Sequence, residues 1–472
     1  MKRKALVGNV IIFLIAFLAL LFSPLSIEDV SISIVLIGLF IVLGQTFITY
    51  LYNKRFDFAP MFLFLYLYLL ISYVLKYILV LYDQSLIWGV DHNIFYAASV
   101  LSDIAPRFYE LAPGLICFCA AIALSAPRKN IAKPPHRTTK SDLARLAIIC
   151  YGLVIIRFIG HIFFNIGMPL EVGTGLPGPI LALYEYIVGV ATIVVLNLAF
   201  YYVWRSGHRN MTVIISIALA INIALSLYAS QKGELVIQVF ALFYYFVIHR
   251  MENRVKIKRS HIAYIVVFSI ITLAIYPYIN LYRFTYSRSG SIAQALYQTQ
   301  EYASLKSDQD NNAVTLIFKR VAGIDKYYPA VTIGKQSEVP ATVLLDNSMS
   351  LLLKEALLGS RADEIRRGIG SSQFAVFYLL GGVLGLVFFS ILLGVIMRWV
   401  FELMFTKVIT YRDTCIAYTP FLAYFYIKIL LTGGNWSLIF NQFVIVAASV
   451  VFLERFAVSR GAPKQAPLPK IQ

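Results

Sequence analysis

Apolar runs of roughly 20 residues recur along the whole chain, and polar or charged segments separate them. A helix rises about 1.5 Å per residue and a bilayer core is about 30 Å thick, so such runs predict membrane-spanning helices. Spanning strands are not expected, because an open sheet leaves unpaired backbone groups in lipid. The pattern predicts an all-α polytopic membrane protein with about twelve spans, at residues 5–22, 30–51, 59–82, 109–126, 144–165, 179–204, 211–229, 235–250, 261–282, 373–397, 414–432 and 436–456.

The composition agrees with this pattern. Hydrophobic residues make up 59% of the chain and charged residues 14%, whereas about a quarter of a soluble domain is charged. The four cysteines lie in or at the edge of apolar runs and form neither a disulfide framework nor a zinc-ligand set; they are Cys117, Cys119, Cys150 and Cys415. The sequence therefore predicts no metal site and no cofactor.

Lysine and arginine are unevenly divided between the two ends of these helices. With the N-terminus inside, the inside segments hold most of the 41 Lys and Arg residues, whereas the short outside loops hold only Arg107 and Lys232. This asymmetry follows the positive-inside rule and predicts that both termini are cytoplasmic. Orientation then explains the net charge of +17, and no nucleic-acid partner is implied.

One outside segment, residues 283–372 between predicted spans 9 and 10, is much longer than the others. It holds 11 Lys+Arg and 9 Asp+Glu, and loops of this length cross the membrane regardless of charge. Because about 90 residues without structure would be unusual, we expect helices near 290–305, 312–333 and 349–365. The predicted organisation is spans 1–9 in residues 1–282, a large helical loop in 283–372, spans 10–12 in 373–456 and a cytoplasmic tail in 457–472.

Five ionisable residues interrupt the apolar runs: Lys76, Arg157, His161, Glu185 and Lys428. A charged group at a helix centre costs a few kcal/mol, so such positions favour a functional role, although a lysine near a helix end such as Lys428 can also snorkel to the surface. Arg157 and His161 are spaced i, i+4 and share a face, and Glu185 begins the next span on the same side. All five lie in the outer halves of their helices, which predicts a water-filled cavity open to the outside.

Further cations are expected on the same side. Lys232 lies in the short turn SQKGE between two apolar runs, and Arg283, Arg288 and Arg320 lie in the large loop. Solvated loop surfaces also carry such charges, as at Lys335. Converging cations suit phosphate oxygens, so a lipid-linked diphosphate is the ligand class that this pattern favours. The candidates for proton transfer are Glu185, Glu234, Asp325 and His161, and Glu185, Asp325 and His161 are the ones that we favour.

Four segments together resemble the Wzy-type polymerases of O-antigen, capsule and exopolysaccharide repeat units. They are SQKGELV, LYRFTYSR, RVAGIDKYYPAV and RRGIGSSQFAVFYLLGGVLG, within about residues 210–390, and the predicted topology of the whole chain is similar as well. The family usually has arginine where this chain has Lys232, so bidentate phosphate binding is not expected at that position.

The resemblance implies a metal-independent glycosyltransferase in the bacterial inner membrane, with its active side in the periplasm. Such enzymes move a growing glycan from polyprenyl (undecaprenyl) diphosphate to the nonreducing end of a carrier-linked repeat unit, and a chain-length regulator and a flippase are implied partners. We expect the substrate diphosphate to be bound by cations, namely Arg157, Lys232, Arg283, Arg288, Arg320, Lys76 and Lys428. A carboxylate or histidine, from Glu185, Asp325 and His161, would accept the proton of the acceptor hydroxyl.

Three other classes fit parts of the pattern. An O-antigen ligase uses the same donor, and the sequence hardly separates it from a polymerase. A twelve-helix transporter or flippase agrees in helix number, but the chain has no evident half-repeat and its outside loop is unusually long. A polyprenyl-phosphate-sugar glycosyltransferase would carry an acidic pair in a large first outside loop, whereas Glu28 and Asp29 lie in a loop of about seven residues.

Overall fold

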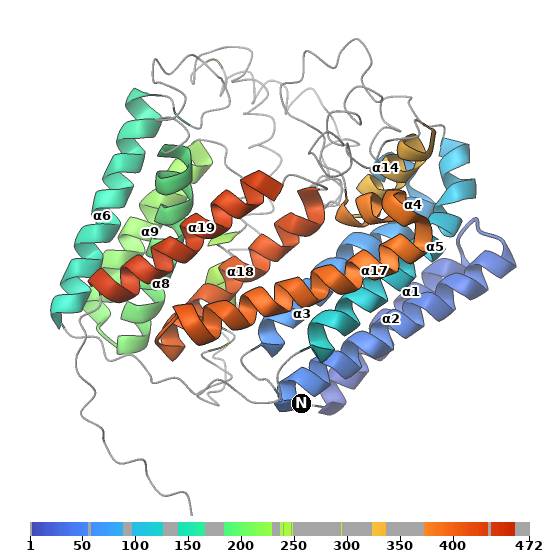
Figure 1. Cartoon of the computed structure of the whole chain (residues 1–472), viewed down its shortest axis with the longest axis horizontal. Helices are drawn as coiled ribbons and strands as arrows, with labels where there is room; N and C mark the ends of the chain where they lie inside the picture. Colours follow the sequence, from blue (N-terminus) through green and yellow to red (C-terminus); the bar gives the residue numbers. More distant parts are fainter. Residues whose placement is uncertain are drawn as a thin grey trace, which may run out of the picture. The chain divides into compact units, whose positions relative to one another are not determined.

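In the computed structural model, every regular element within the described residues is a helix. These are residues 2–54, 58–87, 97–125, 140–164, 184–228, 323–336, 372–432 and 436–457, with 166, 237–238, 240–246, 248 and 294. Within them, seven helices are long and apolar enough to cross a membrane, and Val10–Leu21 is a shorter apolar helix. The chain therefore has the architecture of a polytopic membrane protein, as the apolar runs predict (Figure 1). The predicted span 261–282 lies wholly outside the described residues and 235–250 is described only at 237–238, 240–246 and 248, so the number of twelve spans stays a prediction.

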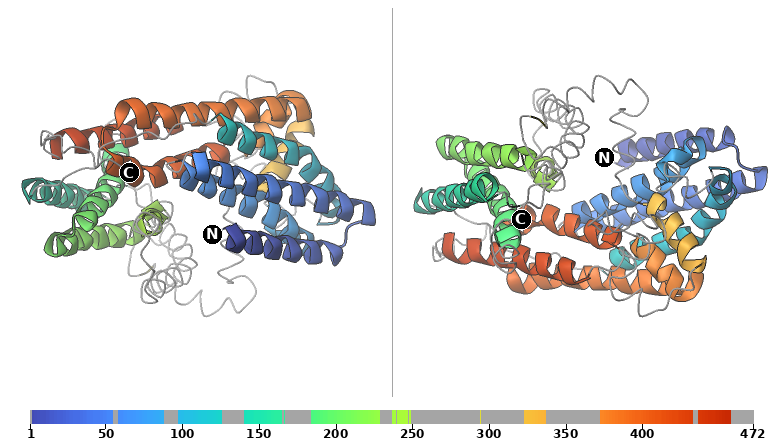
Figure 2. Two further views of the ribbon diagram at one scale, coloured as in Figure 1. Left: turned by 90° about the horizontal axis from the view of Figure 1, so that it is seen from below. Right: turned by 90° about the horizontal axis from the view of Figure 1, so that it is seen from above.

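The chain divides into two compact units. Unit 1 comprises Met1–Ile131, Lys306–Leu403 and Leu422–Phe440, and unit 2 comprises Ala132–Leu305, Met404–Phe421 and Asn441–Gln472. The main helices of unit 1 are α1 (Lys2–Leu21), α2 (Ile27–Lys54), α3 (Ala59–Leu69), α4 (Lys76–Tyr82), α5 (Ala97–Leu124), α14 (Ile324–Gln336) and α17 (Gln373–Leu403). The π-helical turn η1 (Leu70–Leu75) joins α3 to α4, and the short 3₁₀ turn η2 (Gln84–Leu86) follows α4. Both views of Figure 2 show α1 and α2 side by side.

Helix α5 begins at Ala97, about three turns before the predicted start of that span at residue 109. Polar residues and Pro106 interrupt the apolar run there, but packing against α2 and α17 sustains the helix. The Tyr109 hydroxyl donates to the Asp29 main-chain oxygen at 2.8 Å and so joins α5 to the first turn of α2. Arg107, predicted to lie in a loop, is therefore held on a helix.

Helix α17 is broken in its first half. Gly382 has φ 60° and ψ −150°, a conformation that only glycine adopts readily, and residues 373–380 precede this break as a short helix. After the break, α17 packs closely on α5, because a Cβ added at Gly394 would lie 2.9 Å from the Ala121 Cβ. Such close approach at small residues is typical of helix pairs in membranes.

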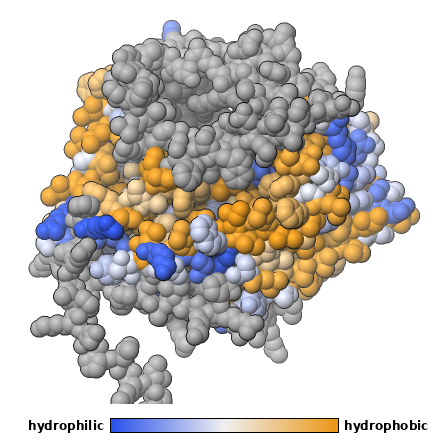
Figure 3. Space-filling model, in the orientation of Figure 1, coloured by the Kyte–Doolittle hydropathy of each residue, from blue (hydrophilic) through white to orange (hydrophobic). Residues whose placement is uncertain are grey.

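The long part of α17 presents large apolar side chains away from the protein. Leu384 is 84% exposed, Phe388 61% and Trp399 63%, and Figure 3 shows the apolar surface that covers this part of the molecule. A continuous apolar face of this kind is a liability in water but suits contact with lipid chains. The break thus separates a buried segment, 373–380, from a lipid-facing one.

Unit 2 is built around three mutually packed helices, α6 (Lys140–Phe163), α8 (Thr192–Ser206) and α9 (Arg209–Tyr228). The π-helical turn η3 (Glu185–Ala191) leads into α8. The other elements of unit 2 are η5 (Met404–Val408), the first part of α18 (Arg412–Thr432), the second part of α19 (Trp436–Phe452) and η6 (Leu453–Ala457). The Glu454 carboxylate accepts the main-chain N–H groups of Thr410 and Tyr411 at 2.8 and 3.1 Å, which caps the start of α18.

Candidate functional site

The interior of unit 2 contains a guanidinium group whose contacts include hydrogen bonds to neutral side chains. Arg157 on α6 is 1% exposed. Its Nη1 donates to Asn222 Oδ1 at 2.8 Å and its Nη2 to Ser226 Oγ at 3.3 Å, so both contacts are with α9. Gln238 extends the network, accepting from Asn222 Nδ2 at 3.1 Å. These contacts fix the orientation of the planar guanidinium.

His161 shares a face of α6 with Arg157, as the i, i+4 spacing predicts. Its Nδ1–H donates to the Ile166 carbonyl at 2.6 Å, so Nε2 carries the lone pair that accepts from Arg157 Nε at 3.1 Å. Both ring nitrogens are thus engaged, and the ring is neutral. In this arrangement His161 positions Arg157, and its predicted part in proton transfer stays a prediction.

Glu185 opens the π-helical turn η3. Its side chain lies outside the described part of the structure, so its predicted contact with Arg157 stays a prediction. The preceding residue, Tyr184, contacts α6 directly. Its hydroxyl donates to the Arg157 carbonyl oxygen at 3.1 Å. The same hydroxyl packs on Gly160, where an added Cβ would lie 1.7 Å from the Tyr184 hydroxyl oxygen. The start of η3 therefore lies beside the turn of α6 that carries Arg157.

Unit 1 contains a buried ion pair between α4 and α14. Lys76 Nζ lies 2.8 Å from Asp325 Oδ1, and the side chains are 0% and 1% exposed. The same Asp325 oxygen accepts the main-chain N–H of Gly323 at 2.8 Å. Gly323 approaches α3–α4 so closely that an added Cβ would lie 2.0 Å from the Ser72 carbonyl oxygen. Two residues that the sequence assigned to the site are thus brought together, one from a membrane span and one from the large loop.

Three polar atoms of α14 are buried without a hydrogen-bond partner among the described residues: Asp325 Oδ2, the Tyr327 hydroxyl and Thr332 Oγ1. Burial, and next the Glu110 carboxylate, raise the pKa of Tyr327 well above its usual value, so this phenol stays protonated and can donate. Asp325 Oδ2 can accept. Leaving such groups unpaired costs on the order of 1–3 kcal/mol each, so a site for a hydroxyl-bearing ligand is a physical reason to retain them.

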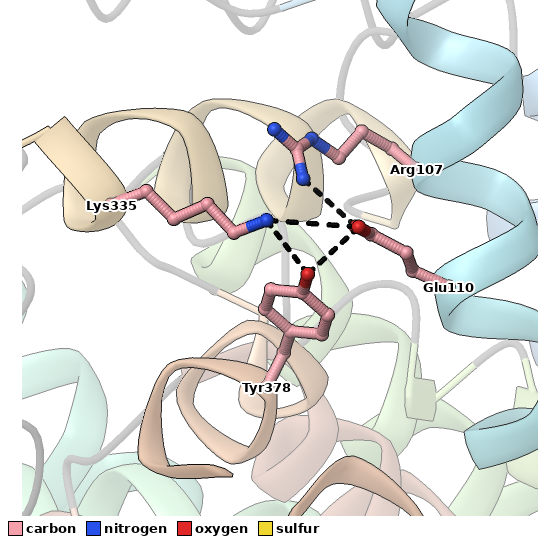
Figure 4. A network of polar contacts seen from close by, with 4 residues as sticks. All are labelled: Arg107, Glu110, Lys335 and Tyr378. Carbon is pink, nitrogen blue, oxygen red and sulfur yellow. Dashed lines mark hydrogen bonds and ion pairs between the residues drawn. The ribbon is translucent and has the colours of Figure 1, made fainter. Parts of the chain in front are cut away.

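The last turn of α14 is fixed by a second polar cluster (Figure 4). Glu110 on α5 accepts from Arg107 Nη1 at 2.9 Å and from the Tyr378 hydroxyl at 2.7 Å. Lys335 donates to the Tyr378 hydroxyl at 2.7 Å and lies 3.6 Å from the Glu110 carboxylate. The sequence favoured a solvated surface for Lys335. The structure instead shows it, 44% exposed, joining α14 to α5 and to the buried first segment of α17.

The other predicted site residues are distributed as follows. Lys428 is half-buried on α18, with its Nζ 5.1 Å from the centre of the Tyr424 ring. Four predicted diphosphate ligands lie outside the described residues: Lys232, Arg283, Arg288 and Arg320. Lys76 and Arg157 belong to different compact units, so the shared cavity stays a prediction.

Sequence reasoning missed the neutral members of the buried network, because it considered only ionisable groups. Asn222 and Ser226 are spaced i, i+4 within a predicted span, which puts two polar side chains on one helix face. Gln238 lies in the next apolar run. Polar residues at helical spacing inside an apolar run were therefore a usable signal for the partners of Arg157.

Within the described residues, no group of three histidine, cysteine or acidic side chains is placed to hold a metal ion. The chemistry available there consists of cations, hydrogen-bond donors and carboxylates. No protein-family model, no curated protein and no solved structure matches the chain.

Proposed function

We propose that this protein polymerises lipid-linked oligosaccharide repeat units on the periplasmic side of a bacterial inner membrane. In this reaction a hydroxyl of the acceptor repeat unit attacks the anomeric carbon of the growing glycan. The bond from that carbon to the phosphate oxygen breaks, the polyprenyl diphosphate departs, and the hydroxyl proton passes to a base. No metal ion is required if cations of the protein stabilise the departing diphosphate.

The observation that carries this proposal is the buried Arg157 guanidinium. A guanidinium oriented by Asn222, Ser226 and the neutral His161 keeps its charge and presents a fixed fork, which suits phosphate oxygens. In a water-poor setting such a group stabilises developing negative charge far better than it would in water. An intramembrane arginine on an otherwise apolar helix is also costly, which favours a functional role.

Asp325, in unit 1, is the carboxylate that we propose as the proton acceptor; its part in the same reaction as Arg157 rests on the sequence pattern, because the two residues belong to different units. One of its oxygens is bound by Lys76 and the Gly323 N–H, and the other has no partner among the described residues. The Tyr327 hydroxyl, two residues further along α14, is a second buried polar atom of this helix. The segments SQKGELV and LYRFTYSR, which resemble the polymerase family, supply further cations for the diphosphate.

Glycan ladders test the proposal. In a strain lacking the gene, plasmid-borne wild-type protein should restore long chains, and Arg157→Ala should not, because losing one stabilising donor slows such reactions about 10²–10³-fold. Arg145→Ala on the same helix is the matched control, since Arg145 is exposed, and it should restore long chains. All variants are compared at equal membrane abundance.

The same strain separates the competing functions. Loss of long chains with single repeat units still attached to the surface supports the polymerase. Carrier-linked polymer that accumulates without surface attachment would instead indicate a ligase. Repeat units trapped on the cytoplasmic side would indicate a transporter, and full-length chains made by Arg157→Ala would remove Arg157 from the site.

A further inference from the structure

Two adjoining cavities lie in unit 2 at the turn between α8 and α9. The larger, of about 470 Å³, is a groove that runs from Trp204 and Arg209 along α9 to Ala220. The smaller, of about 380 Å³, lies between the turn and Leu143 on α6. Gly207 and Arg209 line both cavities, so the two meet at the turn.

The larger cavity extends along one face of α9. Its α9 lining follows one helix face, since Arg209, Thr212 and Val213, Ser216 and Ile217, and Ala220 recur every three to four residues. The eleven steps from Arg209 to Ala220 cover about 16 Å, close to half the thickness of a bilayer core of about 30 Å. Val213 is 53% exposed and Ile217 49%, so this groove is open along its length.

The polar end of the groove is suited to a phosphate group. Arg209 forms no ion pair or side-chain hydrogen bond with any described residue, and His208 and Asn210 line the smaller cavity beside it. Arg205, one turn earlier, has a structural role instead: its Nε lies 3.2 Å from Asp413 Oδ1. Gly207 ends α8 with φ 74°, and a Cβ there would meet no atom within 4 Å, so the junction of the two cavities stays open.

Trp204 lies at the end of α8 where the membrane interface is expected. Its ring stacks on Phe200 at 6.3 Å, on the last turns of α8, and also lines the groove. Tryptophan is enriched at the junction of hydrocarbon and headgroups. The apolar groove therefore begins at the depth where a lipid phosphate gives way to its acyl chain.

We propose that this site binds one anionic phospholipid. The lipid phosphate lies at Arg209 and His208, in the smaller cavity, and one acyl chain lies in the groove along α9. Because the turn WRSGHRN is predicted to be cytoplasmic, the lipid comes from the cytoplasmic leaflet. The site is distinct from the Arg157 network, and the inference does not depend on the glycosyltransferase proposal.

Native mass spectrometry of the purified protein in detergent tests this site directly. Titration with phosphatidylglycerol should give one saturable lipid adduct, and phosphatidylcholine should bind at least tenfold more weakly, because it carries no net charge to match Arg209. Arg209→Gln should weaken phosphatidylglycerol binding at least tenfold. Arg145→Gln, which removes an exposed arginine of α6 that lines neither cavity, should leave binding unchanged.

A second variant tests the groove separately from the charge. Ile217→Trp fills the groove and should weaken binding at least tenfold while Arg209 is intact. Unchanged binding in Ile217→Trp, or displacement of the lipid by millimolar inorganic phosphate, would show a phosphate site without an acyl groove and overturn the proposal. Equal losses in Arg209→Gln and Arg145→Gln would likewise overturn it, since they indicate unspecific attraction of lipid. These measurements need no glycan substrate, so they are independent of the polymerase test.

Discussion

Replacing Lys76 by methionine should leave a buried carboxylate without its cation. The pair is 2.8 Å apart and almost fully buried, and breaking such a pair costs about 3–5 kcal/mol. The N–H of Gly323 still supports the charge. We therefore expect Lys76→Met to lower the free energy of unfolding by about 3–4 kcal/mol.

A double variant tests whether the unpaired carboxylate causes this loss. Lys76→Met combined with Asp325→Asn removes both charges and should recover most of the stability. Equilibrium unfolding in mixed micelles measures both variants.

Lys335→Met is the matched control for a lysine at the other end of α14. Its Nζ is 3.6 Å from the Glu110 carboxylate and the side chain is 44% exposed, so its loss should cost less than about 1 kcal/mol. The reasoning is refuted if Lys76→Met unfolds within about 1 kcal/mol of wild type at pH 7. It is also refuted if the double variant is no more stable than Lys76→Met.

Three further predictions follow from the sequence pattern and the helix geometry. Reporter fusions at residue 310 should give periplasmic signals and fusions at residue 256 cytoplasmic ones; a cytoplasmic signal at 310 would contradict the topology. Arg157→Lys keeps the charge but loses the fork, so glycan ladders should show shortened chains at normal protein abundance, and wild-type chain lengths would contradict this. Gly382→Ala should lower the thermal midpoint in detergent, at a cost of about 1–3 kcal/mol, whereas Gly381→Ala (φ −170°) should not; equal effects would argue against the break in α17.

The membrane helices were predictable because each is a long apolar run, and hydrocarbon permits few alternatives to a helix. The start of α5 could not be predicted in this way. Its first three turns contain Asp103, Pro106 and Arg107, which lower the apolar signal, and the contacts that hold them are made with distant segments such as α2. Such contacts leave no local pattern in the sequence.

The charged members of the buried networks were predictable because their cost in lipid makes them conspicuous. The partners of these charged residues were only partly predictable. The Lys76–Asp325 pair joins residues about 250 positions apart, and no spacing rule links them. Asn222 and Ser226 carry no charge and do not interrupt the apolar run that contains them. The choice of partner is decided by packing, which one sequence does not express.

Both intramembrane sites also contain an irregularity that an ideal helix pattern would not include. Lys76 directly follows the π-helical turn η1, and Glu185 opens η3. A π-turn adds a residue to the helix and changes the face on which later side chains lie.

Around η1, Tyr73 reaches Ser372 at 2.7 Å, Lys76 reaches Asp325, and Tyr77 reaches Ser33 at 2.8 Å. Three polar side chains within five residues thus contact three separate segments of unit 1. Because such a turn weakens the helix ladder, these buried contacts are a physical reason for its retention. A π-turn beside an intramembrane charge therefore supports a functional role for Lys76 that its charge alone would leave open.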